Sequence, residues 1–517
     1  MARALMIQGT GSHAGKSLLV TAFCRIFKQM GYRVAPFKAQ NMALNSFITE
    51  EGGEMGRAQV VQAEAAGVTP SVDMNPVLIK PQSDIGAQVI IQGKVVGNYS
   101  AVEYHSYKKE AIKIVKESYK RLAKKFDLIL IEGAGSPAEI NLKRHDIVNM
   151  RVANLKRHDI VNMRVAQMAD APVLIVSDID RGGVFASLIG TMELLTTSEK
   201  KRVKGFIINK FRGDLNLLKP GLAFIKRKTG IKVLGVIPLI KDIYIQDEDS
   251  VSLEKKFTMD TNGKLDIAVL NLPHISNFTD FDPLEKEDSV SLRYIKDANA
   301  VGKPHVLIIP GSKNTIEDLN YLKTRGYLDE IRRLKKIGST IVGICGGFQM
   351  LGKTISDRYA VESSRRKIEG LGFLDMETQF ENEKTTFQVE AEEIKSEGKR
   401  KSPEVVRGYE IHMGKTRLNS AKSLFKIKRR SGKKCLVYDG AVSRDGKVWG
   451  TYMHGLFDND GFRRRFLHRI SKKENIPKKK TAGDFEYDTF KEEHYDKLAD
   501  LVRNSLDMKL IYKLVGN

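Results

Sequence analysis

Short apolar runs alternate with amphipathic stretches through most of this chain, and this alternation limits its fold more than any other feature. In the first half the runs are LMIQG, RVAPFK, LILIEG, VLIVSD, GFIINK and VLGVIP, and the stretches between them include residues 16–30, 101–125 and 184–196. Apolar runs of roughly four to eight residues bounded by turn residues are typical of buried parallel strands, which need helical connections. The sequence therefore predicts an α/β fold with a doubly wound sheet.

The same alternation resumes in the second half after a break. Residues 241–264 are acidic and then polar, and the runs LDIAVLNLP, HVLIIPG and TIVGICGG follow them. A chain of 517 residues also exceeds the length of one ordinary domain, which is roughly 150 residues. We therefore expect two doubly wound α/β domains at residues 1–240 and 265–465, a linker at 241–264, and a basic helical C-terminal tail at 466–517.

Composition argues against several classes of protein. The beginning, MARALMIQGTG, has one Arg and a short apolar run, which resembles neither a signal peptide nor a membrane span. The three cysteines lack the paired spacing of a disulfide scaffold or zinc site, and Cys24 and Cys435 are expected to pack as small hydrophobic residues. The net charge of +23 is not accompanied by a nucleic-acid-binding motif. We expect a soluble, cytoplasmic protein that binds neither membranes nor nucleic acid, and its oligomeric state stays open.

The segment GTGSHAGKS, residues 9–17, is a candidate phosphate-binding loop. It follows the apolar run LMIQ and precedes the helical LLVTAFCRIF, which is the strand, loop and helix context of a P-loop. Backbone N–H groups around Gly11 and Gly15 would surround phosphates. Lys16 would place its charge on the terminal phosphates, and the Ser17 hydroxyl would bind Mg²⁺. Counted from its first glycine, the loop is one residue longer than the strict motif.

A nucleotide site with Mg²⁺ also needs an acidic group, and DLILIEGAGS offers one. Glu132 ends this predicted central strand and is followed by small residues that permit close approach. An isolated Glu would be interpreted as structural. Because this one lies at the carboxyl end of a strand in the same domain as the loop, we predict that Glu132 lies near Mg²⁺.

The segment TIVGICGGFQMLG predicts an exposed nucleophile. Gly343 and Gly347 flank Cys345, and small residues there permit a sharp turn from strand to helix, followed by backbone N–H groups that can form an oxyanion hole. A thiol needs a base, which meets it in space and not in sequence. His454 in GTYMHGLF, at the end of another strand-like run, is our candidate, and His412 in GYEIHMG is a weaker one.

These motifs also resemble known families. PGSKNTIEDL, GICGGFQMLG, GYEIHMG and GTYMHGLFD occur in the order found in class I glutamine amidotransferases of the cobyrinate-amidating type. The first half resembles the dethiobiotin-synthetase-like P-loop ATPases, whose phosphate loop has the same extra residue. With PFKAQNMALNSF, GAGSPAEINL and DIDRGGVFAS, roughly residues 1–465 resemble the cobyric acid synthase family, glutamine-dependent enzymes of cobalamin biosynthesis.

The resemblance implies a two-site mechanism. In one site Cys345 attacks the glutamine amide with His454 as general base, and Gly311 and Gly346 supply the oxyanion hole. The resulting thioester is hydrolysed after ammonia has left. In the other site ATP with Mg²⁺ phosphorylates a carboxylate of adenosylcobyrinic acid a,c-diamide, and ammonia displaces the phosphate. The family repeats this reaction at the b, d, e and g side chains.

The resemblance assigns further roles. Lys38 would lie near the reacting carboxylate and phosphate, and Asn209 in FIINK would bind the adenine. Arg181 and Gly182 in DIDRGGVFAS would help to hold the corrinoid. Many class I amidotransferases have Glu two residues after the catalytic His, but this chain has Leu456 there. The third residue of the triad is therefore absent or comes from elsewhere.

Two other functions stay open. One is the sister activity, amidation of the a and c side chains, although the segment KAQNMALNSF resembles the later enzyme and so argues against it. The other is a P-loop partitioning or scaffolding ATPase. Such proteins usually have a further lysine early in the loop, where this chain has Gly11, and they have no reason to carry GICGG with a distant MHGLF.

The phrase NLKRHDIVNMRVA occurs twice in succession, at residues 141–153 and 154–166. Members of the cobyric acid synthase family, which this chain resembles, carry the phrase once. Thirteen extra helical residues at about 100° each would rotate the following residues by roughly 220° and move an apolar stripe off the core. We predict that one copy is extruded as a loop or surface helix while the other keeps the native packing. The alternatives are a damaged synthetase site or a duplication introduced in the recorded sequence.

Overall fold

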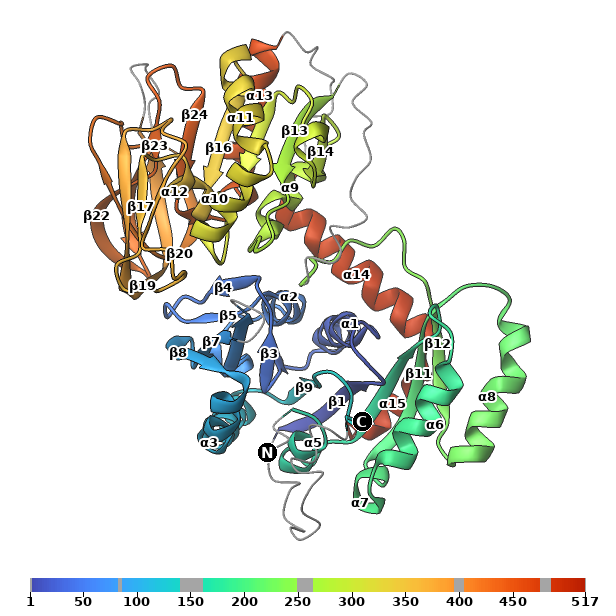
Figure 1. Ribbon diagram of the computed structural model, residues 1–517. Coiled ribbons are helices and arrows are strands. Elements are labelled where there is room, and N and C mark those ends of the chain that lie inside the picture. The colour runs from blue at the N-terminus through green and yellow to red at the C-terminus, as the bar shows by residue number, and fades with distance from the viewer. Residues whose placement is uncertain are drawn as a thin grey trace.

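The computed structural model describes residues 2–81, 86–139, 161–248, 264–394, 404–474 and 485–516. Within these ranges the chain forms two α/β units, one built on each of two largely parallel six-stranded sheets (Figure 1). The predicted fold class is therefore confirmed. None of the described helices is long and apolar enough to cross a membrane.

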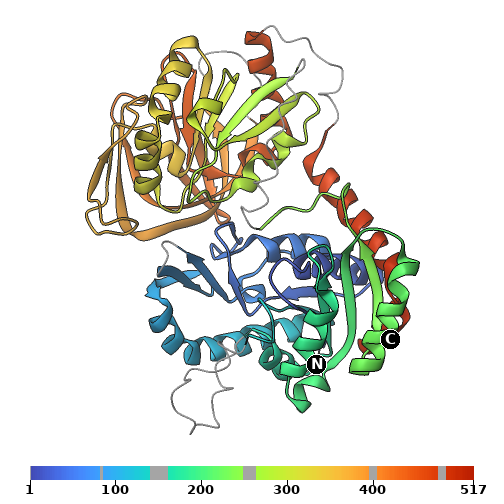
Figure 2. The same cartoon turned by 45° about the vertical axis from the view of Figure 1, so that its right-hand side comes forward.

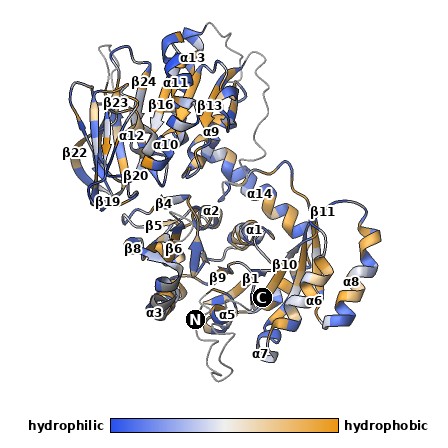
Figure 3. Cartoon of the chain, viewed as in Figure 1, coloured by the Kyte–Doolittle hydropathy of each residue, from blue (hydrophilic) through white to orange (hydrophobic). Residues whose placement is uncertain are grey.

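The first sheet is entirely parallel, with the strand order β12-β11-β10-β1-β9-β2. Its central strands are apolar on both faces, as expected of strands covered by helices on both sides (Figure 3). Parallel strands place their carboxyl ends at one edge, where the phosphate loop and Glu132 emerge. The strands are β1 (Arg3–Gly9), β2 (Val34–Phe37), β9 (Leu128–Glu132), β10 (Val173–Asp178), β11 (Val203–Phe211) and β12 (Val233–Pro238).

Helices cover both faces of this sheet and bury two hydrophobic clusters. One face packs against α1 (Lys16–Gln29), α14 (Tyr487–Ser505) and α15 (Met508–Leu514). The other packs against α3 (Ala101–Lys125), α5 (Met163–Met168), α6 (Val184–Leu194) and α8 (Leu215–Thr229). α2 (Arg57–Ala66) contributes to both clusters, and α7 (Thr197–Lys200) follows α6.

The described end of the chain, residues 485–516, returns to the first unit. Leu498 and Val502 of α14 are fully buried in the cluster beneath α1. Arg25 of α1 holds Asp496 of α14 through its Nε and Nη2 atoms, at 2.6 and 2.8 Å. The part of the expected tail that the structure describes beyond residue 485 is thus helical and packed. The expected domain boundaries themselves stay a prediction, and residues 249–263 of the expected linker lie outside the described residues.

Small β elements of the first unit lie between the two large sheets (Figures 1 and 2). A four-stranded sheet has the order β3-β6-β7-β8, and a two-stranded hairpin pairs β4 with β5. Thr386 Oγ1 of the second unit donates to the carbonyl of Gly52 in this hairpin's turn, at 2.9 Å. The elements are β3 (Gln40–Met42), β4 (Ser46–Ile48), β5 (Glu54–Gly56), η1 (Val72–Met74), β6 (Val77–Pro81), β7 (Gly86–Ile91) and β8 (Lys94–Ser100).

The second unit contains a six-stranded sheet and a largely antiparallel sheet beside it. The first has the order β14-β13-β15-β16-β24-β23 and is parallel except at β23. Its strands are β13 (Leu265–Leu270), β14 (Val290–Ile295), β15 (Val306–Ile309), β16 (Thr340–Ile344), β23 (Ala441–Val442) and β24 (Val448–Thr451).

The remaining elements of the second unit complete the antiparallel sheet and cover both sheets. The strands are β17 (Thr354–Ser356), β18 (Lys367–Glu369), β19 (Met376–Glu393), β20 (Val405–Leu418), β21 (Phe425–Arg430), β22 (Lys433–Asp439) and β25 (Met453–His454). The helices are η4 (Phe278–Phe281), α9 (Asp282–Glu285), η5 (Ala298–Ala300), α10 (Thr315–Thr324), α11 (Tyr327–Ile337), α12 (Gly346–Met350), η6 (Leu456–Asp458) and α13 (Asp460–Lys473).

Most of the doubled phrase lies outside the described residues, which resume at Val161. The last residues of the second copy are packed: Asn162 Nδ2 donates to the carbonyls of Ala134 and Ser136, at 2.7 and 3.2 Å, and Met163 begins α5. These bonds hold the start of α5 against the loop after β9. The predicted extrusion of one copy concerns residues outside the described ranges and stays a prediction.

Deleting residues 141–153 should change the free energy of unfolding by about 1 kcal/mol or less, because the closure cost of a connection changes slowly with its length. The deletion removes none of the described contacts, and residues 140 and 154–160 remain to join Glu139 to Val161. Since the two copies are identical, removing either one gives the same protein. Urea denaturation of both proteins measures the difference. A loss of several kcal/mol would show that both copies contribute to the folded core.

Candidate active sites

The predicted phosphate loop lies between β1 and α1. Gly15 has a φ of 101°, and a Cβ atom there would lie 2.1 Å from Asn209 Nδ2, so glycine is required at this position. Lys16 Nζ donates to the carbonyl of Gly11 at 2.8 Å and to that of Gly135 at 3.1 Å. The ammonium group therefore lies across the loop, where its charge would face bound phosphate.

The end of β11 supports this loop. Asn209 Nδ2 donates to the carbonyl of Ala14 at 3.0 Å. Lys210 Nζ donates to the carbonyl of His13 at 2.7 Å and pairs with Asp178 Oδ2 at 2.8 Å. Asn209 thus holds the backbone of the phosphate loop, a contact that the sequence did not reveal, while its predicted contact with adenine stays a prediction.

Glu132 contacts two other residues predicted for this site, Ser17 and Lys38. Its Oε1 atom accepts hydrogen bonds from Ser17 Oγ at 2.8 Å and pairs with Lys38 Nζ at 2.9 Å. Its Oε2 atom accepts from Gln62 Nε2 of α2 at 2.6 Å. Burial alone would raise the pKa of the Glu132 carboxyl, but Lys38 and the hydrogen bonds lower it overall. The group is therefore an anion at neutral pH.

The donor atoms at this edge fit a magnesium ion. The hydroxyl of Ser17 and the carboxylate of Glu132 are hard oxygen donors, which Mg²⁺ prefers. Among the described residues no group of three or more His, Cys, Asp or Glu side chains could hold a metal. A P-loop site does not need such a group, because Mg²⁺ there takes few protein ligands and completes its shell with phosphate oxygens and water.

Arg181 and Gly182 lie in the turn between β10 and α6. Gly182 and Gly183 both have positive φ, at 78° and 71°, which allows the tight turn into the helix. The turn leaves the carboxyl end of β10, where Ser177 Oγ lies 2.8 Å from Thr10 Oγ1 of the phosphate loop. Both predicted residues are thus at the same edge of the sheet as that loop, and their contact with a corrinoid stays a prediction.

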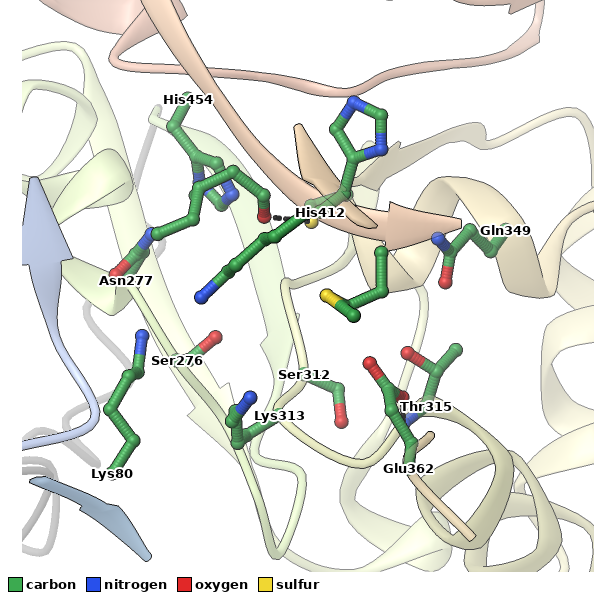
Figure 4. Close-up of a pocket in the computed structure, with 14 residues that line it drawn as sticks. Lys80, Ser276, Asn277, Ser312, Lys313, Thr315, Gln349, Glu362, His412 and His454 are labelled. Atoms are coloured by element: carbon green, nitrogen blue, oxygen red, sulfur yellow. Dashed lines mark hydrogen bonds between the residues drawn. The ribbon is translucent and has the colours of Figure 1, made fainter. Parts of the chain in front are cut away.

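In the second unit Cys345 lies at the sharp turn predicted from GICGG. It connects β16 to α12 with φ 50° and ψ −105°, a backbone conformation that is rare for residues other than glycine. A Cβ atom on Gly347 would lie 1.9 Å from the carbonyl oxygen of Ile309, so the turn needs this glycine. This backbone conformation places the thiol in the wall of the pocket shown in Figure 4.

His454 lines the same pocket at the end of β25 and is 1% exposed. Its Nδ1 atom lies 2.6 Å from Oδ2 of Asp280 in η4, and the backbone N–H of Gly455 donates to Oδ1 at 3.0 Å. Since Nδ1 is engaged, Nε2 is the ring nitrogen left to serve Cys345. Asp280 thus lies where the third member of a Cys–His–Asp triad would lie, although no motif in the sequence predicted it.

Charges around His454 decide its protonation. Burial alone would lower its pKa, but Asp280 and Cys345 raise the pKa of the imidazole to about 10. The ring is therefore an imidazolium at neutral pH when it faces a thiolate. An imidazolium beside the thiolate is a proton source for a leaving amide nitrogen.

Of the two glycines predicted for the oxyanion hole, Gly346 begins α12 directly after Cys345, and Gly311 lies in the segment that follows β15. A Cβ atom on Gly311 would lie 3.2 Å from Cε1 of His454, and one on Gly346 would lie 3.0 Å from the backbone nitrogen of Ser312. Gly311 thus lies against His454 and Gly346 follows Cys345 directly, and a Cβ atom at either position would make a tight contact. That their N–H groups bind the oxyanion stays a prediction.

His412, the weaker candidate base, also lines the pocket. Its ring stacks on Tyr452 with centroids 3.7 Å apart, and its Nδ1 atom lies 2.7 Å from the carbonyl of Gly414. The nearest oxygen of Glu410 is 3.9 Å from Nε2. His454 has the closer carboxylate partner and is the better placed base.

Both units contribute cationic side chains to this pocket. Lys80 of β6 comes from the first unit and Lys313 from the second (Figure 4). Lys384 of the second unit also lines the pocket. Glu54 of β5 pairs with Lys80 at 2.8 Å and with Lys384 at 2.5 Å. Burial lowers the pKa of Lys313 to about 7. The first unit thus closes one side of the pocket that holds Cys345.

The fold and the two sites define a class of protein: a glutamine amidotransferase unit joined to a P-loop nucleotide-binding unit. Residues 266–462 match the family model described as the CobB/CobQ-like glutamine amidotransferase domain, and residues 5–253 match the CobQ/CobB/MinD/ParA nucleotide binding domain. The chain belongs to the cobyric acid synthase family. It is a glutamine-dependent amide ligase of cobalamin biosynthesis.

Three relatives support this assignment over the whole chain. The cobyric acid synthase of Thermoanaerobacter sp. (strain X514) is 52% identical, and the match covers 100% of this chain and 99% of the relative. That of Syntrophobacter fumaroxidans is 49% identical over 100% of this chain and 99% of the relative. That of Clostridium tetani is 51% identical over 99% of each. The family that the motifs resembled is confirmed.

Replacing Asp280 with Asn should lower the kcat for glutamine hydrolysis by about 10²- to 10⁴-fold, as loss of the orienting carboxylate does in other triads. The pKa of His454 should also fall, because Asp280 raises it. Asp282→Asn is a matched control, since this buried carboxylate accepts from Tyr244 at 2.6 Å and belongs to the same segment. Steady-state glutaminase assays measure both. An Asp280→Asn protein with the wild-type kcat would exclude Asp280 from the triad.

Proposed function

We propose that this protein uses ATP and glutamine to amidate the b, d, e and g carboxylates of adenosylcobyrinic acid a,c-diamide, giving adenosylcobyric acid. The observation that carries the proposal is the path of residues 36–47, PFKAQNMALNSF, between the two sites. Lys38 pairs with Glu132 beside the phosphate loop at 2.9 Å. The backbone N–H of Ser46 donates to Asn277 Oδ1 in the wall of the Cys345 pocket, at 3.0 Å. One segment thus contributes to both reaction sites.

In the glutaminase site, the Cys345 thiol gives its proton to His454, and the resulting thiolate attacks the amide carbon of glutamine. His454, held by Asp280 at 2.6 Å, takes the thiol proton and gives it to the leaving nitrogen. Backbone N–H groups of Gly311 and Gly346 stabilise the negative oxygen of the tetrahedral intermediate. Ammonia leaves, and water hydrolyses the thioester to glutamate and free thiol.

In the synthetase site, a corrinoid carboxylate attacks the terminal phosphorus of ATP and ADP leaves. The carboxylate is a poor acceptor for ammonia until this acyl phosphate supplies a good leaving group. Lys16 and Lys38 place positive charge where phosphate charge develops. Ser17 and Glu132 would hold Mg²⁺, which neutralises phosphate charge when bound. Ammonia then attacks the acyl carbon, phosphate leaves, and an amide forms.

The sister activity, amidation of the a and c side chains, is the second candidate. The segment KAQNMALNSF, which resembles the later enzyme, favours the b, d, e and g reaction. A scaffolding ATPase would not need a cysteine and a histidine that line one pocket, with an aspartate 2.6 Å from the histidine.

A substrate comparison tests the proposal. The purified protein is incubated with ATP, Mg²⁺, glutamine and either cobyrinic acid or adenosylcobyrinic acid a,c-diamide, and the amidations are counted by mass spectrometry. We expect the a,c-diamide to be converted to adenosylcobyric acid. Conversion of cobyrinic acid to its a,c-diamide, with the diamide left unchanged, would instead establish the sister activity.

A further inference from the structure

A side chain of the first unit contacts Tyr409, the residue whose ring packs on the proposed glutaminase base His454. Arg57, the first residue of α2, donates from Nη2 to the hydroxyl of Tyr409 in β20 at 2.9 Å. The same hydroxyl donates to the carbonyl of Ser46 at 3.2 Å. Arg57 and Tyr409 are 5% and 2% exposed, so this contact is shielded from water. The hydroxyl of Tyr409 is thus held by two residues of the first unit.

Tyr409 in turn packs on the glutaminase base. Its ring stacks on that of His454, with centroids 5.2 Å apart and an angle of 18° between the planes. Their strands pair directly, Tyr409 opposite His454. The imidazole therefore has Asp280 at Nδ1 and the Tyr409 ring against its face. A ring held both at its edge and against its face has little freedom to rotate away from Cys345.

The helix that carries Arg57, α2, is anchored at the nucleotide site by hydrogen bonds. Gln62 of α2 donates to Glu132 Oε2 at 2.6 Å, and Gln59 of α2 donates to the same atom at 3.4 Å. The Oε1 atom of Gln59 accepts from Asn41 Nδ2 at 3.0 Å. One helix of ten residues thus links the carboxylate beside the phosphate loop to the tyrosine beside His454.

We propose that Arg57 of the synthetase unit, acting through Tyr409, is a positioning residue for the glutaminase base His454. The inference rests on the proposed function, because it assigns His454 that role. It goes further in stating that the glutaminase site is completed by the other unit. Arg57 and Tyr409 do not touch the glutamine amide; they fix the imidazole that does.

A double-mutant cycle in the full-length protein tests the proposal. Tyr409→Phe keeps the stacked ring and removes the hydroxyl, whereas Arg57→Gln removes the guanidinium. Each should lower the kcat for glutamine hydrolysis about tenfold, the usual effect of one well-placed hydrogen bond, with the KM for glutamine within about twofold of wild type. The double variant should be no worse than Tyr409→Phe alone, because the bond between Arg57 and the Tyr409 hydroxyl is already absent in that variant. Arg57→Lys, which keeps a donor, should recover part of the rate.

The matched control is Thr386→Val. This change removes another hydrogen bond between the units, from Thr386 Oγ1 to the carbonyl of Gly52 at 2.9 Å, at a residue that does not line the Cys345 pocket. Its kcat should equal that of wild type. Amidation supported by ammonium chloride should be unchanged in every variant, which shows that the synthetase unit is intact.

Three results would overturn the inference: a wild-type kcat in Tyr409→Phe, additive effects in the double variant, or a fall in ammonium-supported amidation equal to the fall in glutamine hydrolysis. Failure of the proposed function has a different signature. In that case the unmodified protein itself would fail to hydrolyse glutamine or would leave the corrinoid unamidated, and the inference would fall with it.

Discussion

Replacing Cys345 with Ser should abolish glutamine-dependent amidation, by about 10³-fold or more, while amidation supported by ammonium chloride persists. The thiol supplies the nucleophile that forms the thioester, and a serine hydroxyl at the same turn is a far weaker nucleophile at neutral pH. The backbone at Cys345 should tolerate the change, since Ser is nearly the same size. The synthetase site takes its nitrogen as ammonia, and its residues Lys16, Ser17 and Glu132 do not line the Cys345 pocket.

The measurement is product formation with each nitrogen source, followed by mass spectrometry of the corrinoid. Cys435→Ser is the matched control, because Cys435 lies in β22 with its Sγ atom 3.9 Å from the carbonyl of Ile427 and lines no part of the pocket. That control should keep full activity. If the Cys345→Ser protein retained glutamine-dependent amidation, the glutaminase assignment would be wrong.

Replacing Lys16 with Ala should abolish amidation with either nitrogen source, by about 10³-fold or more, because the ammonium group stabilises the charge that develops on the transferred phosphoryl group. Lys16 already lies across the loop, donating to the carbonyls of Gly11 and Gly135. Glutamine hydrolysis should continue at a measurable rate, since Lys16 is not part of the Cys345 pocket.

The matched control is Lys28→Ala, at the last turn of the same helix α1. Its Nζ atom lies 3.9 Å from Oε2 of Glu492. Lys28 is at the opposite end of α1 from the phosphate loop. Lys28→Ala should amidate at the wild-type rate. Amidation by Lys16→Ala at the rate of this control would remove the phosphate loop from the mechanism.

Local patterns in the sequence were sufficient for much of the fold and for the core of each site. The order of apolar run, glycine-rich loop and amphipathic segment identified β1, the phosphate loop and α1, because all three are contiguous. The small residues around Cys345 identified its turn for the same reason. Glu132 was found because its strand ends at the edge where parallel strands meet, and it does lie 2.8 Å from Ser17 Oγ.

Contacts between segments that are distant in the sequence could not be predicted from local patterns. Asp280 and His454 are 174 residues apart, and nothing in NFTDFDPLE distinguishes Asp280 from the acidic residues beside it. Its position shortly after a buried parallel strand was a usable hint, since such strands end at the functional edge of a sheet. The contact between Arg57 and Tyr409 joins two units whose docking no local pattern encodes.

The described C-terminal helices show the same limit. The apolar stripe of α14 predicts that this helix is covered, but amphipathicity does not name the covering partner. The partner is α1, which α14 contacts through Arg25 and Asp496, 471 residues apart. A Lys-rich composition near the C-terminus suggested a separate tail, whereas the helix packs in the first core.

The two-site reaction requires that nitrogen released at Cys345 is used at the site of Lys16 and Glu132 in the same protein. The most direct test incubates the unmodified protein with glutamine labelled with ¹⁵N at its amide, ATP, Mg²⁺ and adenosylcobyrinic acid a,c-diamide, and counts ¹⁵N in the corrinoid by mass spectrometry. We predict one ¹⁵N atom at each of the b, d, e and g side chains. A corrinoid that stays unamidated while labelled ammonia accumulates would show that nitrogen released at Cys345 is not used at the synthetase site.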